Sequence, residues 1–302
     1  MNPHSLALAA ILWIASTCHG LDVVCTTGMV GDLVSNIAGD RARVTTLMKE
    51  GVDPHLYRPT RDDIAKLQKA DLIFHNGLHL EGRLGQTLEK LDSPSRPSIA
   101  VAESIPEHLI LHEGNSPDPH VWMDPALWAR CIRVVEETLS SKDPEGSLDF
   151  AQNALALEQT LSTLSFTLQQ ATQTIPATQR TLVTAHDAFQ YYARANNLEV
   201  LSILGLSTES EAGVADINRL VDEIVLRRIP AIFVESTLSD KNVRAIVEGA
   251  AARGHTLRIG GTLYADSLGP ANSPAGTTAG MLRENTRAIV SALGGNPSSI
   301  TP

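Results

Sequence analysis

Residues 143–174, which read DPEGSLDFAQNALALEQTLSTLSFTLQQATQT, form the longest helical pattern of the chain and contain no strand signal. Apolar side chains recur in it at spacings of three and four residues, as on one face of an α-helix: Ala154, Leu157, Leu161, Leu164, Leu168 and Ala171. Asp143 and Pro144 suit a helix start, because Asp caps helix N-termini and Pro fits the first turn. Ile175-Pro176 ends the pattern. A helix of about 30 residues is roughly 45 Å long, so we interpret the segment as a rigid strut between two lobes, with an ordinary long surface helix as the alternative.

Short strand patterns alternate with helical patterns on both sides of this segment. Before it, strands are expected at 21–27, 44–48, 71–75 and 98–102, and helices near 29–38, 60–69, 80–91 and 125–141. After it, strands are expected at 181–184, 198–204, 231–235 and 255–259, and helices near 187–196, 214–228, 240–253 and 275–294. This alternation predicts an α/β fold with mostly parallel sheets in two lobes, 21–142 and 176–302, joined by one long helix over 143–175. Ligands bind beyond the carboxyl ends of parallel strands, so a site in the cleft between the lobes is expected.

The composition describes a globular, acidic chain that begins with an export signal. The 302 residues include 24 basic and 34 acidic side chains, a net charge of −10, which argues against nucleic acid as the main partner. Residues 1–20, MNPHSLALAAILWIASTCHG, hold no Lys, Arg, Asp or Glu, and the apolar run 6–15 has signal-peptide length. We predict cleavage after Gly20 and a periplasmic or extracytoplasmic mature protein. A lipid anchor at Cys18 is the second-ranked alternative.

Two cysteines remain in the mature chain, Cys25 in a strand pattern and Cys131 in a helical pattern. In an oxidising compartment they could pair. We favour two separately buried thiols instead, because each lies in an apolar pattern. Neither has a neighbouring cysteine at metal-ligand spacing, which excludes a thiolate zinc site.

Three histidines and one aspartate share a placement that suits a metal site. His55 lies in GVDPHLYRPT (51–60) and His120 in DPHVW (118–122), so Asp-Pro-His occurs twice. His186 follows the predicted strand 181–184, and Asp266 ends IGGTLYAD (259–266). Proline stiffens a loop, which suits a ligand whose position must not wander. Three imidazoles and one carboxylate form a donor set for Zn²⁺ that also accommodates Mn²⁺.

Other interpretations of these residues stay open at this point. A lone histidine in a loop is commonly a surface or capping residue, and we assign no role to the remaining histidines. Glu211 and Glu235 could act as a base or support a ligand, but they equally suit a helix start and a strand end. The chain has no Gly-x-Ser-x-Gly, no phosphate loop and no His-Glu-x-x-His. A zinc hydrolase that uses the same histidines, and an adhesin with a purely structural metal, are the rival hypotheses.

Several longer motifs resemble those of a known family. They are GVDPHLY (51–57), NGLHLE (76–81), DPHVW (118–122), TAHDAF (184–189), PAIFVES (230–236), KNV (241–243) and IGGTLYAD (259–266). The sequence resembles the metal-binding solute-binding proteins of ABC transporters for zinc and manganese. The resemblance implies two α/β lobes bridged by a long helix, with one metal ion held in the cleft by His55, His120, His186 and Asp266. It also implies a non-enzymatic protein, expected to be a monomer, that delivers its ion to a membrane permease.

Two features bear on which metal is carried. Manganese-preferring members of this family typically have Glu where this chain has His186, and zinc-specific members often have a long loop rich in His and acidic residues before the second ligand. Here the segment 103–119 contains only two histidines, His108 and His112, so this loop is short or absent. Imidazole-rich sites bind Zn²⁺ more tightly than Mn²⁺. We therefore expect Zn²⁺ to bind in vitro, with Mn²⁺ as the alternative physiological cargo.

Overall fold

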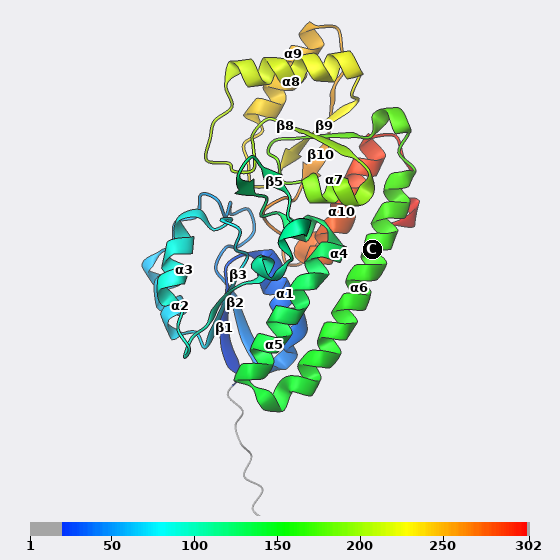
Figure 1. The fold of residues 1–302 in the computed structure, drawn as a ribbon. Helices are drawn as coiled ribbons and strands as arrows, with labels where there is room; N and C mark the ends of the chain where they lie inside the picture. The colour runs from blue at the N-terminus through cyan, green and yellow to red at the C-terminus, as the bar shows by residue number, and fades with distance from the viewer. Residues whose placement is uncertain (1–19, 301–302) are drawn as a thin grey trace, which may run out of the picture.

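The computed structural model describes residues 20–300, so the predicted signal peptide and Cys18 lie outside the described residues, apart from Gly20. The long helix α6, Ser147–Gln173, extends along both the N-terminal and the C-terminal parts of the molecule (Figure 1). The predicted stripe faces the core: all of its members are buried except Leu157, which is half-buried. No helix within residues 20–300 is long and apolar enough to cross a membrane.

The start of α6 differs from the prediction. A 3₁₀ turn, Pro144–Gly146, comes first, and the Asp143 side chain does not cap it. Instead, the Asp143 carboxylate accepts hydrogen bonds from Arg41 Nε at 2.7 Å and Arg41 Nη2 at 3.0 Å. The guanidinium holds the pKa of Asp143 below its usual range. The expected N-cap is therefore wrong, because an ion pair with the N-terminal part takes the carboxylate.

The N-terminal strands form one parallel sheet in the order β2-β1-β3-β4. The strands are β1 Leu21–Cys25, β2 Ala42–Thr46, β3 Leu72–His75 and β4 Ser98–Ala100, and the helices between them are α1 Gly28–Ala38, α2 Arg61–Lys69 and α3 Gly85–Leu91. Successive side chains of a strand point to opposite faces. Val23 and Phe74 accordingly pack in a core with α1 and α6, whereas Val24 and Ile73 pack in a second core with α2 and α3.

The link from this sheet to α6 is more broken than expected. The predicted helix 125–141 is two helices, α4 Pro125–Trp128 and α5 Ile132–Lys142, separated by a 3₁₀ turn at Ala129–Cys131. A small antiparallel hairpin, β5 His112–Glu113 and β6 Ser116–Pro117, was not predicted.

Cys25 and Cys131 are both buried and free, and burial raises the pKa of each thiol. The interpretation as separately buried thiols is confirmed.

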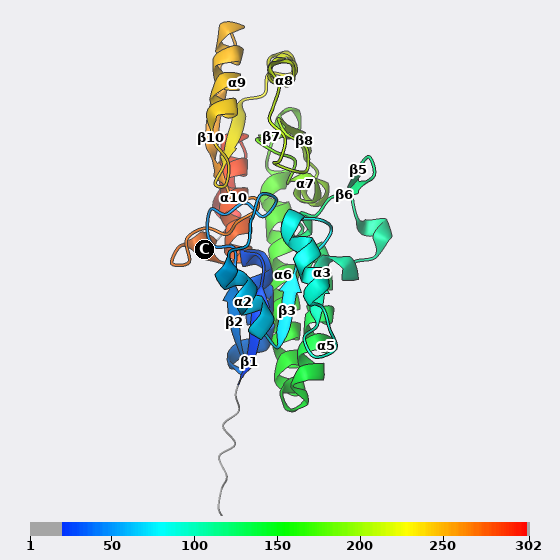
Figure 2. The ribbon, with the colours of Figure 1, turned by 90° about the vertical axis from the view of Figure 1, so that its left-hand side faces the viewer.

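The C-terminal strands pair in parallel, β7 Thr181–Thr184 with β8 Glu199–Ser202 and β9 Ala231–Glu235 with β10 Arg258–Leu263. The helices are α7 Gln190–Asn196, α8 Val214–Arg227, α9 Lys241–Ala252 and α10 Thr278–Ala292. Figure 2 shows α8 and α9 at the end of the molecule away from the N-terminal sheet. The predicted strand 255–259 begins later, because His255 lies before it with Nε2 2.7 Å from the Ile229 carbonyl oxygen.

Short 3₁₀ turns and one continuous core complete the fold. Further turns are at Gly39–Arg41, Gly82–Leu84, Val101–Ser104, Glu107–Leu109, Val121–Met123, Ala177–Gln179, Pro274–Gly276 and Pro297–Ser299. The largest core extends from Val23 in β1 through Leu161 in α6 to Phe233 in β9 and Met281 in α10. The N-terminal and C-terminal strands thus belong to one core that also includes α6. The mostly parallel α/β fold with one long helix is confirmed.

Candidate metal centre

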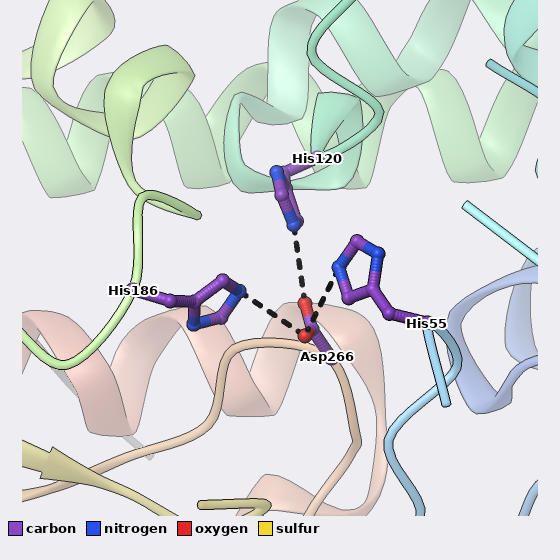
Figure 3. Close-up of side chains that lie close together, drawn as sticks. All are labelled: His55, His120, His186 and Asp266. Atoms are coloured by element: carbon purple, nitrogen blue, oxygen red, sulfur yellow. Dashed lines mark ion pairs between the residues drawn. The ribbon is translucent and has the colours of Figure 1, made fainter. Parts of the chain in front are cut away.

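The structure brings His55, His120, His186 and Asp266 together at one point (Figure 3). One ligand atom from each side chain lies within 4.8 Å of the others. His186 Nε2 is 3.1 Å and His55 Nε2 3.6 Å from Asp266 Oδ2, and His120 Nε2 is 3.4 Å from Asp266 Oδ1. His55 follows β2, His186 follows β7 and Asp266 follows β10, whereas His120 follows the short hairpin. Among residues 20–300 this is the one group of three or more such side chains close enough to hold an ion.

Among the described residues, the polar atoms at the centre of this group make no hydrogen bonds and lie only against one another. Nε2 of all three histidines and both carboxylate oxygens of Asp266 are buried and make no hydrogen bond within residues 20–300. His120 and His186 are 0% exposed, Asp266 is 2% and His55 is 6% exposed. A buried polar atom without a partner destabilises a fold, so such atoms are rare. Five of them converging on one point indicate a place for a cation.

The repeated Asp-Pro-His has a local structural reason. Asp53 Oδ1 accepts a hydrogen bond from His55 N at 2.9 Å, and Asp118 Oδ1 accepts one from His120 N, also at 2.9 Å. In each case the aspartate closes a tight turn onto the backbone two residues later, and the intervening proline holds φ fixed. Asp118 Oδ1 also lies 2.7 Å from His120 Nδ1. The same motif therefore presents two histidines from two different loops.

His186 obtains its carboxylate from a distant strand. Glu235, at the end of β9, accepts hydrogen bonds from Ala185 N at 2.8 Å and His186 N at 2.9 Å, and its Oε2 lies 2.5 Å from His186 Nδ1. A carboxylate at Nδ1 favours the proton there and leaves the lone pair of Nε2 directed at the centre. Of the two glutamates left open above, Glu235 supports a ligand, whereas Glu211 is exposed in the loop before α8.

These contacts shift the pKa values of the candidate ligands in different directions. Burial alone would lower the pKa of His186, but Glu235 and Asp266 outweigh it and hold that pKa well above its usual value. Burial also lowers the pKa of His55, and Asp266 only partly offsets this effect. Burial would raise the pKa of Asp266, but the three histidines bring it below its usual range. The centre therefore combines an ionised carboxylate with imidazoles.

The motif NGLHLE (76–81) supports the second Asp-Pro-His loop, which presents His120. Glu81 is buried and accepts hydrogen bonds from Asn76 N at 2.6 Å, Gly77 N at 3.1 Å and the Thr26 hydroxyl at 2.8 Å. Asn76 Nδ2 donates to the carbonyl oxygen of Pro119 at 3.0 Å, one residue before His120. The sequence alone assigns no structural role to this motif, because its bonds to Thr26 and to Pro119 span 55 and 43 residues.

Two close approaches complete this support. A Cβ at Gly82, where φ is +45°, would lie 2.7 Å from the His55 carbonyl oxygen, so the loop needs glycine there. Trp122 Nε1 donates to Ala265 O at 3.0 Å, which joins the His120 loop to the Asp266 loop. The segments that carry the four side chains are thus connected to one another, as expected of a preformed site.

The other histidines lie outside this centre. His75 is 4.0 Å from Glu81 Oε2, and His112 is 3.3 Å from the exposed Glu107. His79 and His108 are exposed. None of these, nor His255, belongs to the group of candidate ligands.

Comparisons with known proteins agree with the fold and the centre. The family model described as "Zinc-uptake complex component A periplasmic", ZnuA, matches residues 23–292. The zinc-binding protein TroA of Treponema pallidum is 44% identical over 273 residues, which is 90% of this chain and 88% of TroA. The manganese-binding lipoprotein MntA of Bacillus subtilis is 40% identical over 275 residues, 90% of each chain.

The solved structure of TroA from Treponema pallidum, described as a periplasmic zinc-binding protein, superposes with a TM-score of 0.88 at 43% identity. The match covers 91% of this chain and 99% of that one. These relatives are named as binding proteins, so the hydrolase hypothesis gains no support from them. The chain belongs to the ZnuA family of periplasmic metal-uptake components.

Proposed function

We propose that this protein captures a divalent transition metal ion, Zn²⁺ or Mn²⁺, outside the cytoplasm and delivers it to an ABC-type importer. The observation that carries the proposal is the convergence of five buried, unpartnered polar atoms on one point. The ion is the cargo of the protein, one per chain, and the protein catalyses no reaction. The transporter's membrane permease is the partner.

We propose His55, His120, His186 and Asp266 as the four ligands. A tetrahedral Zn²⁺ site with bonds of about 2.1 Å has edges of about 3.4 Å. His186 Nε2 and His55 Nε2 lie 3.1 and 3.6 Å from Asp266 Oδ2, near such an edge, and His120 Nε2 lies 3.4 Å from Oδ1. Four side chains fill a tetrahedral shell, whereas a catalytic zinc site keeps a position for water. This donor set favours capture over hydrolysis.

We propose that Zn²⁺ binds more tightly than Mn²⁺ in vitro, because the donor set is rich in imidazole. TroA is named for zinc and MntA for manganese, and the chain is 44% and 40% identical to them, respectively. Similarity alone therefore does not separate the two ions, and Mn²⁺ stays the alternative cargo.

We further propose that the mature chain works as a monomer with two lobes, 21–142 and 176–302, joined by the helix over 143–175. The continuous core along α6 supports limited lobe movement on metal binding. Export follows the signal predicted in residues 1–20, and a lipid anchor at Cys18 remains the alternative mode of attachment. Size-exclusion chromatography and mass spectrometry of protein from its native envelope test the oligomeric state and the anchor.

The first experiment is elemental analysis of the purified mature protein, followed by titration of the metal-free form with Zn²⁺ and Mn²⁺. We expect one tightly bound ion per chain, with Zn²⁺ the tighter. In His186→Ala the affinity should fall at least tenfold, since one of four ligands is lost. Absence of stoichiometric metal after addition of both ions would refute the proposed function.

A further inference from the structure

The three histidines of the metal centre are not held equally. His120 Nδ1 and His186 Nδ1 each lie against a carboxylate, at 2.7 Å from Asp118 and 2.5 Å from Glu235. His55 Nδ1 has no hydrogen-bond partner within residues 20–300, and His55 is the most exposed of the four side chains. The position of His55 therefore depends on its backbone turn and on what fixes that turn.

A segment of the C-terminal part reaches this turn. Residues 203–208, here called the bridging segment, begin beside His186, where Leu204 N donates to Ala185 O at 3.0 Å and Asp187 N donates to Gly205 O at 3.2 Å. At the other end of the segment, the Thr208 hydroxyl donates to Asp53 Oδ2 at 2.6 Å. The segment thus extends from the backbone around His186 to the turn that presents His55.

Asp53 joins the two contacts in one carboxylate. Its Oδ1 accepts the hydrogen bond from His55 N at 2.9 Å, while its Oδ2 accepts the one from Thr208. Thr208 is buried, and a hydrogen bond to a carboxylate is stronger than one between neutral groups. The Asp53 side chain cannot turn away from His55 N without also breaking the bond to Thr208.

We propose that the Thr208 hydroxyl is a positioning group for metal retention: through Asp53 it holds His55 on the ion, so that release begins when this bond opens. The inference rests on the proposed function. A bound ion leaves when one ligand lets go, and the imidazole without a partner at Nδ1 needs the least disruption to move. A second bond between the two parts, from Gly51 N to the Ser267 hydroxyl at 2.8 Å, keeps the loop in place when Thr208 is changed.

The test is the rate of Zn²⁺ release from the full mature chain, followed by stopped flow with excess chromophoric chelator. Thr208→Val removes the hydroxyl at nearly constant volume, and we expect release about tenfold faster, the effect of losing a hydrogen bond to a charged group. Thr208→Ser restores the hydroxyl and should release within about twofold of wild type. The matched control is Thr60→Val, because the Thr60 hydroxyl also donates to an aspartate, Asp63, at 2.7 Å, but at the N-cap of α2. It should leave the release rate unchanged.

A double-mutant cycle separates positioning from general loosening of the structure. If Thr208 acts through His55, then Thr208→Val added to His55→Ala should change the Zn²⁺ dissociation constant by less than about twofold. Unchanged release in Thr208→Val, or an equal effect with and without His55, would overturn this inference while wild type still binds one ion. Failure of wild type to bind Zn²⁺ would overturn the proposed function, and this inference with it.

Discussion

Glu235→Gln asks whether a carboxylate at Nδ1 is what makes His186 a metal ligand. In the structure one oxygen of Glu235 accepts the amides of Ala185 and His186, and the other lies 2.5 Å from His186 Nδ1. Glutamine has the same shape and keeps one oxygen, which we expect to stay on the two backbone amides. Its NH₂ group then faces Nδ1. Because NH₂ only donates, Nδ1 must become the acceptor and the ring proton moves to Nε2, the atom that points at the ion position.

The expected loss follows from this wrong tautomer. Changing the carboxylate behind a metal-binding histidine typically costs about 10–100-fold in affinity, or about 1.4–2.7 kcal/mol. We expect a value near the upper end, because His186 and Glu235 are buried and water has no access to replace the contact. The pKa of His186 also predicts how this loss of affinity depends on pH. Glu235 helps hold the pKa of His186 well above its usual value, so in metal-free wild type the ring carries a proton that the ion must displace. In the variant this competing proton is bound less tightly, so the difference in Zn²⁺ affinity between the variant and wild type should shrink as the pH falls.

The assay is Zn²⁺ competition against a chromophoric chelator between about pH 6 and pH 9. Asp124→Asn is the matched control, because Asp124 is also buried and accepts two backbone amides, at the N-cap of α4, yet it touches no candidate ligand. The reasoning is refuted if Glu235→Gln binds within about threefold of wild type at the alkaline end. An equal loss in Asp124→Asn would point to general loosening of the fold rather than to the tautomer.

Three further outcomes are expected. Zn²⁺ binding near neutral pH should release about one proton from His186, because the lowered pKa of His55 leaves the His55 ring already neutral. Calorimetry in buffers of different ionisation enthalpy measures this release, and a value of zero would contradict the assignment. The metal-free protein should be folded, as judged by circular dichroism. Zn²⁺ at about 1,000 times its dissociation constant should add about 4.1 kcal/mol to the free energy of unfolding, and His120→Ala should abolish the resulting increase in Tm. Unfolding on metal removal would favour a structural metal instead. Leu164→Ala in the buried stripe of α6 should cost about 2–5 kcal/mol in urea denaturation, yet leave the Zn²⁺ affinity of the folded protein unchanged.

The repeating elements of the fold could be predicted because their signals are local. The stripe of α6 repeats with the helical period, and the alternation of strands and helices specifies a parallel sheet. What failed depends on partners elsewhere in the chain. Asp143 reads as a cap, but Arg41, 102 residues away, takes its carboxylate. The hairpin at residues 112–117 has strands of two residues each, too short for any alternation to appear.

The candidate ligands could be found in the same way, but most of the groups that position them could not. Asp53 and Asp118 are visible in the repeated Asp-Pro-His, because each bonds to a backbone amide two residues away. Glu235 lies 49 residues from His186, and Thr208 lies 155 residues from Asp53. The sequence singles out Glu235 only as one of two alternatives and carries no signal for Thr208, because only the folded topology brings these pairs together.

One core continues from β1 through α6 to β9 and α10, and this limits how far the loaded and the empty protein can differ in shape. Opening the two halves like a book would expose apolar surface along that core, at a steep cost in free energy. We therefore expect the outline of the protein to change little between the loaded and the empty form. An importer that distinguishes the two forms would then have to respond to the mobility of the loops that carry the candidate ligands. The two forms would thus differ in their dynamics more than in their shape.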